Sequence, residues 1–183
     1  DVYKRQGILT GFCNINEDEV GEDNSHAAAI IYDYSVLAGS QGFFHHQKLD
    51  RICEKAEEFS LPVVIFTEGG GGRPGDTDVT TQIAGLHIPS FSTWARLTGK
   101  CLKIAVNNGY CFAGNAVLFG CSDFMIATKQ SWIGMAGPAM IEGGGLGVYD
   151  PKEIGPAEEQ YKNGVLDYLA EDEKEATFIA KKL

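Results

Sequence analysis

Two glycine-rich segments, about forty residues apart, are the parts of this sequence best suited to take part in a reaction. The first reads Thr-Glu-Gly-Gly-Gly-Gly-Arg at residues 67–73, and the second reads Asn-Gly-Tyr-Cys-Phe-Ala-Gly-Asn-Ala at residues 108–116. Each follows a mainly apolar run rich in β-branched residues, at 61–66 and 103–106, which is typical of a buried strand. If the two turns lie side by side, backbone N–H groups from both can point at one place, as oxyanion stabilisation requires.

A glycine run after a strand also raises the hypothesis of a nucleotide-binding loop. A P-loop ends in Gly-Lys-Ser or Gly-Lys-Thr, whereas this run continues as Gly72-Arg73-Pro74. A dinucleotide fingerprint needs a helix N-terminus at the point where Pro74 and Asp76 stand. Both nucleotide hypotheses are therefore disfavoured. A purely structural loop remains an alternative, which the second glycine turn weakens.

The second segment predicts a helix that begins near Gly114. The free N–H groups and positive dipole end of such a helix would face a ligand at that end. A structural alternative is that the small residues let the helix pack closely against the sheet. The sequence alone leaves both interpretations of this segment open.

Other titratable side chains form no convincing catalytic or metal-ligating group. His45 and His46 are adjacent and so do not share a helix face, and no CxxC or HExxH pattern accompanies them. Asp76 and Asp78 could act as bases, although capping of the loop explains them more simply. Cys111 lies in the second segment without an identifiable histidine partner, which favours a small core thiol. We therefore predict no metal site.

The elements that would position the two segments alternate between strand and helix. The sequence predicts strands at 27–36, 61–67, 103–107, 123–128 and 132–135, and helices at 45–59, 87–98, 114–120, 151–160 and 171–183. This alternation favours a single α/β domain with largely parallel strands. Residues 1–25 are expected to be an irregular or truncated N-terminal segment. Because the pattern ends inside a helix, the native protein is expected to continue.

Composition narrows the classes of partner. The chain has 183 residues, of which 44% are hydrophobic and 22% charged, as in a globular domain. The net charge of −10 disfavours nucleic-acid and membrane partners, and no apolar run approaches the roughly 20 residues of a membrane helix. Five cysteines without a CxxC pair favour reduced thiols. We expect a cytoplasmic protein, or a mitochondrial matrix protein if it is eukaryotic.

In combination, these motifs resemble the crotonase superfamily, and most closely the beta-type carboxyltransferase component of biotin-dependent acyl-CoA carboxylases. The resemblance covers roughly residues 26–183 and implies the ClpP/crotonase ββα superhelix, as an N-terminal, acyl-CoA-binding domain incomplete at both ends. The stretches that carry it are residues 33–42, 66–76, 108–116, 122–126, 137–138, 153–157 and 164–167.

The resemblance also implies roles for individual residues. The acyl-CoA thioester oxygen would sit between two backbone N–H groups, with Gly72 and Gly114 as the catalytic donors. Arg73 would order the loop or approach a CoA phosphate. The expected substrate-binding residues are Gly70, Gly71, Arg73, Ala113 and Asn115.

Two positions decide against a hydratase or isomerase. Enzymes of that kind in the crotonase superfamily move protons with glutamates, which by resemblance would stand at Val117 and near Ala139. Both positions are apolar here. A carboxyltransferase does not need this pair, because the resemblance implies that carboxybiotin delivers CO2 and that the released biotin takes the α-proton.

The resemblance further implies partners. No Met-Lys-Met biotin attachment site occurs in the sequence, so biotin would be carried on a separate protein or domain. The expected partners are the biotin carboxyl carrier, biotin carboxylase, the C-terminal carboxyltransferase half and further copies of the chain. The expected reaction carboxylates the α-carbon of a short acyl-CoA of the acetyl-, propionyl- or methylcrotonyl-CoA type. The alternatives are a subunit of a biotin-dependent acyl-CoA decarboxylase and a non-catalytic CoA-binding or assembly module.

Overall fold

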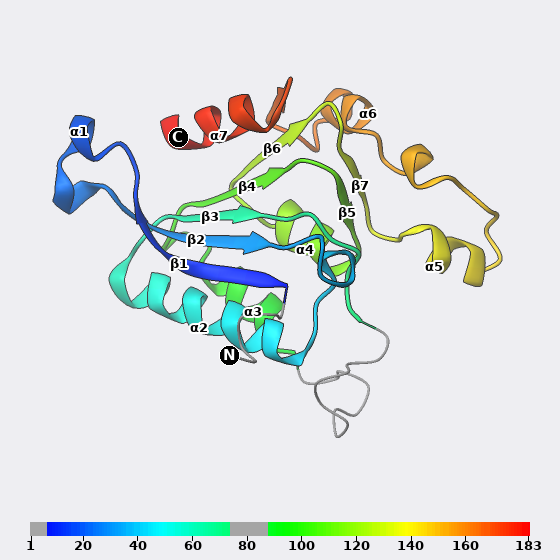
Figure 1. Cartoon of the computed structure of the whole chain (residues 1–183), viewed down its shortest axis with the longest axis horizontal. Coiled ribbons are helices and arrows are strands. Elements are labelled where there is room, and N and C mark those ends of the chain that lie inside the picture. The colour runs from blue at the N-terminus through cyan, green and yellow to red at the C-terminus, as the bar shows by residue number, and fades with distance from the viewer. Residues whose placement is uncertain (1–6, 74–87) are drawn as a thin grey trace.

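The apolar, β-branched segments of the sequence form the centre of a layered α/β structure, seen in a computed structural model that describes residues 7–73 and 88–183. Within these residues a six-stranded sheet has the order β1-β2-β3-β4-β6-β8 (Figure 1). Its strands are β1 (Ile8–Asn14), β2 (His26–Tyr32), β3 (Val63–Phe66), β4 (Lys103–Asn107), β6 (Phe124–Thr128) and β8 (Tyr168–Ala170). All neighbouring pairs are parallel except β1 with β2. The predicted α/β architecture with a largely parallel sheet is confirmed.

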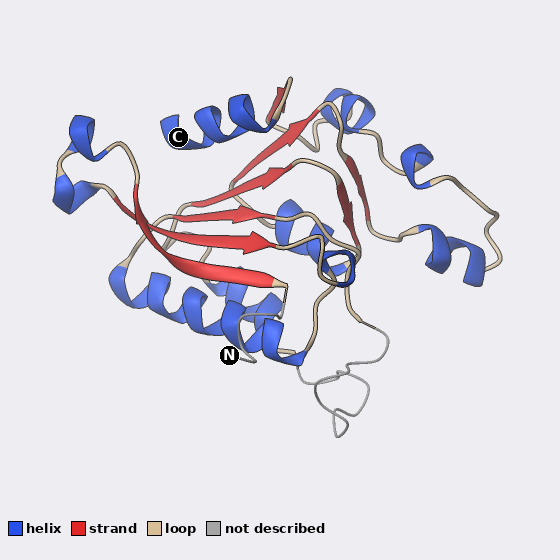
Figure 2. Cartoon of the chain, viewed as in Figure 1, coloured by secondary structure: helices blue, strands red, loops and turns tan. Residues whose placement is uncertain are grey.

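Helices cover both faces of this sheet (Figure 2). One face is covered by α2 (Phe43–Phe59), α3 (Ser90–Arg96) and α4 (Gly114–Gly120), and the other by α7 (Glu173–Lys182). The α7 side packs Ala176 and Ala180 against the apolar residues of β4 and β6. Burial of the sheet on both faces accounts for the nearly continuous apolar character of β4.

The helix predicted at 45–59 is confirmed as part of α2, and its evenly spaced apolar residues are buried except the last. Leu49, Ile52, Cys53 and Ala56 are buried, whereas Phe59 is 57% exposed and stacks edge-on with Phe12 of β1. Phe59 is the last helical residue, because Ser60 takes a left-handed conformation that ends α2. Phe59 has the helical spacing of this face but lies outside the core.

Several boundaries differ from those predicted. The irregular segment expected at 1–25 is corrected for residues 8–14, which form β1 as the antiparallel edge strand, followed by α1 (Glu17–Val20). β2 ends at Tyr32 instead of residue 36, because Asp33 accepts hydrogen bonds from the Ser35 N–H and hydroxyl and starts a turn. The helix predicted at 151–160 is broken at Gly155-Pro156, before α6 (Ala157–Lys162).

Two short strands form a second, parallel pair that the sequence only partly predicted. β5 (Tyr110–Phe112) pairs with β7 (Trp132–Gly134). Beyond β7, α5 (Pro138–Gly143) and the chain up to residue 150 extend away from the main sheet as an arm (Figure 1). Among the described residues, no helix combines the length and apolarity that crossing a bilayer would require.

Candidate functional site

The two glycine segments lie against each other at the carboxyl ends of β3 and β4. The Gly69 N–H donates to Tyr110 O at 2.7 Å, and the Phe112 N–H donates to Gly69 O at 2.8 Å. A Cβ atom built on Gly71 would lie 2.6 Å from Ala113 Cβ and 3.3 Å from Gly114 N. Only glycine fits at this contact, where φ of Gly71 is also +89°. We call residues 67–73 the first bend and residues 108–116 the second bend.

Asn115 fastens the second bend to the first. Its side-chain oxygen Oδ1 accepts from the Gly71 N–H at 3.0 Å, and its Nδ2 donates to Thr67 O at 3.1 Å and to Gly39 O at 3.4 Å. The side chain is fully buried. Asn115 therefore acts on backbone groups that would otherwise be buried without partners.

A third segment, residues 36–42, also borders the first bend. The Gln41 N–H donates to Gly71 O at 2.7 Å, the Arg73 N–H donates to Gln41 O at 2.9 Å, and the Gly70 N–H donates to Ala38 O at 2.9 Å. Residues 33–42 were among the stretches that carry the resemblance, but no role in the site was predicted for them. The small residues Ala38-Gly39-Ser40 after a strand are the signal that could have found it.

These contacts determine which backbone donors remain available. The N–H groups of Gly69, Gly70, Gly71 and Arg73 are all used within the protein. Those of Gly72 and Gly114 have no hydrogen-bond partner within residues 7–73 and 88–183. Gly72 and Gly114 are the donors that the sequence predicted for an oxyanion, and that role stays a prediction.

The backbone conformation of Ala113 sets the start of α4. Ala113 has φ 52° and ψ −120°, a conformation that is strained for a residue with a side chain. Its N–H donates to Gly134 O at 3.0 Å, which ties the bend to β7. The chain therefore turns sharply at Ala113, and the first free N–H of α4 belongs to Gly114.

Arg73 points back along the first bend. Its Nε donates to Ser40 Oγ at 3.3 Å, and its Nη2 lies 3.4 Å from the position of a Cβ built on Gly7. The guanidinium thus links the first bend to the third segment and to the start of β1. This geometry favours the loop-ordering role among the two roles predicted for Arg73.

Glu68 is a buried titratable group beside the bends that the sequence analysis did not single out. Its Oε1 accepts from the Asn108 N–H at 2.6 Å. Burial raises the pKa of the Glu68 carboxyl above its ordinary value. The position of a glutamate between a strand and a glycine run was the available signal.

Stability should therefore depend on pH through Glu68. Because the folded pKa lies above the ordinary value of 4.5, the folded state binds more protons than the unfolded state between these two values. The free energy of unfolding should fall as pH rises through that window. Glu68→Gln keeps an oxygen for the Asn108 N–H and should remove this slope, as measured by denaturation from pH 4 to pH 8. If the free energy of unfolding of Glu68→Gln changes with pH in parallel with that of the wild type, the assignment to Glu68 is wrong.

The remaining sequence candidates play no visible chemical role. The Cys111 thiol is fully buried, and burial raises its pKa to about 12, so it is not a thiolate at neutral pH. Val117 lies on α4 and Ala139 on α5, with no group for proton transfer at either position. Asp76 and Asp78 lie outside the described residues. In the described part of the chain, no cluster of three or more His, Cys, Asp or Glu is placed to hold a metal ion.

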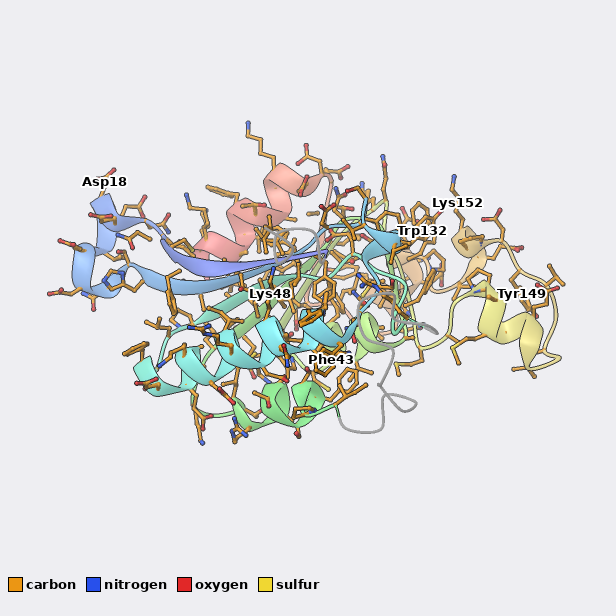
Figure 3. All side chains as sticks on the ribbon, turned by 60° about the horizontal axis from the view of Figure 1, so that its bottom comes forward. Asp18, Phe43, Lys48, Trp132, Tyr149 and Lys152 are labelled. Atoms are coloured by element: carbon orange, nitrogen blue, oxygen red, sulfur yellow. The ribbon has the colours of Figure 1, made fainter. Side chains whose placement is uncertain are left out.

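Aromatic rings surround the second bend. The Tyr110 ring lies 5.0 Å from that of Trp132 and 6.4 Å from that of Tyr34, measured between centroids. Lys152 Nζ lies 5.8 Å from the centroid of Trp132, and Figure 3 shows both side chains where the arm meets the domain. Met135 and Met140, beyond β7, are each 66% exposed. Aromatic rings therefore border the second bend, and two exposed methionines follow on the side of the arm.

A cavity of about 370 Å³ lies elsewhere, between β1 and α2. Its lining includes Phe12, Lys48, Arg51 and Lys55, and no residue of the two bends contributes to it. The candidate site therefore rests on the hydrogen-bond geometry of the bends, not on the shape of this cavity.

Comparison with known proteins adds three findings. A family model described as the carboxyl transferase domain matches residues 25–183. The methylmalonyl-CoA carboxyltransferase 12S subunit of Propionibacterium freudenreichii subsp. shermanii is 30% identical over 183 residues, which are 100% of this chain and 33% of that protein. The structure of a single-chain, multi-domain long-chain acyl-CoA carboxylase superposes with a TM-score of 0.90 and 49% identity, over 96% of this chain and 17% of that one.

A more distant likeness concerns the fold alone. A Pseudomonas malonate decarboxylase heterodimer matches with a TM-score of 0.77 and 20% identity, over 97% of this chain and 75% of that chain. The chain thus spans about a third of the curated carboxyltransferase subunit described above and a smaller share of the multi-domain carboxylase.

Proposed function

The chain belongs to the carboxyl transferase domain family and has its crotonase-like fold, and from this premise we propose that it is the acyl-CoA-binding half of a carboxyltransferase. In this proposal the whole protein transfers a carboxyl group to the α-carbon of an acyl-CoA. One observation carries the proposal: two unpaired backbone N–H groups, at Gly72 and Gly114, on bends that touch each other.

These two donors would bind the thioester oxygen. When the α-proton leaves, the thioester becomes an enolate and its oxygen gains negative charge. A donor that is already in place costs no reorganisation at that moment, and each is worth about 2.7–4 kcal/mol in the transition state. Because Asn115 and Gln41 hold the bends from both sides, the donors are preorganised.

The neighbouring residues would shape the substrate site. Gly70 and Gly71 keep side chains away from the thioester, and Ala113 sets the direction of the second bend. The Asn115 side chain is fully buried, so it would support the site through its hydrogen bonds to the first bend and not through contact with the substrate. Arg73 orders the loop.

Other components would complete the reaction. Carboxybiotin, carried on a separate protein or domain, would supply the carboxyl group when bound. The described residues of this chain would bind and orient the acyl-CoA. The biotin carboxyl carrier, biotin carboxylase, the C-terminal carboxyltransferase half and further copies of the chain are the proposed partners.

A second candidate function, left open by the sequence, is a subunit of a biotin-dependent acyl-CoA decarboxylase. A non-catalytic CoA-binding module is the third. The sequence predicted a short acyl group, while the long-chain carboxylase that is 49% identical makes longer chains equally worth testing.

The full-length protein should therefore be tested for acyl-CoA binding by calorimetry and for carboxyl transfer from carboxybiotin. The acyl series should run from acetyl- to palmitoyl-CoA. We expect binding and transfer with at least one acyl-CoA. Binding without transfer in either direction would favour the CoA-binding module. A folded protein that binds no acyl-CoA would contradict the proposal.

A further inference from the structure

We propose that Gln41 is a positioning residue of this site, which joins the two bends and holds Gly114 in place. The inference rests on the oxyanion role proposed above. It concerns a residue of the third segment, outside both glycine motifs.

The backbone of Gln41 pairs with the first bend. Its N–H and C=O bind Gly71 and Arg73, at 2.7 and 2.9 Å, in the manner of a short parallel ladder opposite Gly72. Both bonds flank Gly72 without using its N–H. The backbone of Gln41 therefore fixes the residue that carries the first free donor.

The side chain of Gln41 reaches the second bend. It is only 3% exposed, and its Oε1 lies 2.7 Å from the position of a Cβ built on Gly114. The ring of Phe91 lies 3.2 Å from the same position. Gly114 is thus seated against a carboxamide and an aromatic ring, and only a residue without a side chain fits there without displacing them.

The side-chain carboxamide of Gln41 is itself held in place by a hydrogen bond. Gln41 Nε2 donates to the Tyr32 hydroxyl at 3.0 Å. The Tyr32 ring is buried and stacks on that of His45, with centroids 4.5 Å apart. Tyr32 therefore fixes the position of the carboxamide that lies against Gly114. The other end of the carboxamide, Oε1, has no hydrogen-bond partner within the described residues.

Loss of this support should act on the chemical step. Without the hydrogen bond to Tyr32, the side chain at position 41 is free to move and the second bend can shift with it. A displacement of about 1 Å can cost about 100-fold in rate. The backbone bonds of Gln41 do not depend on its side chain, so the first bend should stay in place.

The first test is Gln41→Met in the full-length protein, which keeps the length of the side chain and removes its hydrogen bond. We expect kcat to fall about 10- to 100-fold, while KM for the acyl-CoA changes less than about twofold. Gln47→Met is the matched control, because Gln47 is exposed on α2, and it should leave both constants unchanged. Tyr32→Phe removes only the anchoring hydroxyl and should lower kcat in the same direction.

The second test is Gln41→Glu, followed over pH. The introduced carboxylate can accept a hydrogen bond from Tyr32, and it places a negative charge beside Gly114. Its rate relative to wild type should fall as pH rises through the pKa of the new carboxyl, because a like charge opposes the developing oxyanion. The two buried titratable groups packed beside this carboxamide, His45 and Tyr32, each keep one protonation state between pH 5 and 8. Burial lowers the pKa of His45 to about 3 and raises that of Tyr32 well above 10.

The outcomes separate the two proposals. A wild-type protein that binds acyl-CoA but transfers no carboxyl group contradicts the proposed function. An active wild type with unchanged kcat in both Gln41→Met and Tyr32→Phe overturns the inference about Gln41 alone. A ratio of Gln41→Glu to wild-type rates that is flat over pH would overturn it as well.

Discussion

Replacing Gly114 with proline should lower kcat for carboxyl transfer by about 100- to 1,000-fold relative to Gly114→Ala, because it removes one hydrogen-bond donor to the oxyanion. Gly114 is the first residue of α4, a position where proline is compatible with a helix and where the missing N–H breaks no helical bond. The measurement is steady-state transfer by the full-length protein with saturating acyl-CoA.

Alanine is the necessary reference at this position. Either replacement adds a Cβ, which would lie 2.7 Å from Gln41 Oε1 and 3.2 Å from Phe91 Cζ. The clash of the Cβ is therefore shared, and the two variants differ in the N–H and in the proline ring, whose Cδ restricts Ala113. Equal rates for folded Gly114→Pro and Gly114→Ala would reject Gly114 as a donor.

The first bend offers the same comparison with less steric interference. Apart from its chain neighbours, no atom of residues 7–73 and 88–183 lies within 4 Å of a Cβ built on Gly72, which is exposed. Gly72→Ala should thus remain close to wild type, and Gly72→Pro should lose activity to a similar extent as Gly114→Pro. Because the two donors would act on one oxygen, the double proline variant should lose less than the product of the two single effects.

The sequence predicted that the two glycine bends would meet, because backbone topology decides their position. Each glycine bend follows an apolar strand, and parallel strands bring their carboxyl ends to one edge of the sheet. The contact between Gly71 and Ala113 and the free N–H groups of Gly72 and Gly114 agree with that expectation. The β4 and α4 boundaries also matched, since their apolar periods are clear.

What the sequence did not predict depends on contacts between distant segments. Gln41 lies about 30 residues before the first bend, and nothing in its local pattern shows that its carboxamide reaches Gly114. β1 was missed because Thr10 and Gly11 interrupt its apolar residues, and pairing with β2 provides its order. The pairing of β5 with β7 was missed because each has only three residues.

Replacement of Asn115 by leucine should be the most damaging single change to the fold of the site. Leucine has a similar volume, but it removes the hydrogen-bond partner of the Gly71 N–H and of the Thr67 and Gly39 carbonyl oxygens. Buried backbone groups left without partners cost about 1–3 kcal/mol each. We expect the free energy of unfolding to fall by about 3–5 kcal/mol, as measured by chemical denaturation.

Asn115→Asp distinguishes the hydrogen bond that the Asn115 side chain accepts from those that it donates. It retains an oxygen for the Gly71 N–H and replaces the donating Nδ2 by an oxygen that faces the Thr67 carbonyl at about 3.1 Å. We expect it to be destabilised most above neutral pH, where the introduced carboxyl would be ionised, and to recover as pH falls.

Asn163→Leu, at an exposed position after α6, is the control and should change stability by less than about 0.5 kcal/mol. If Asn115→Leu unfolds at the same denaturant concentration as this control, the bends are held together by something other than Asn115. The preorganisation on which the oxyanion proposal depends would then need another source.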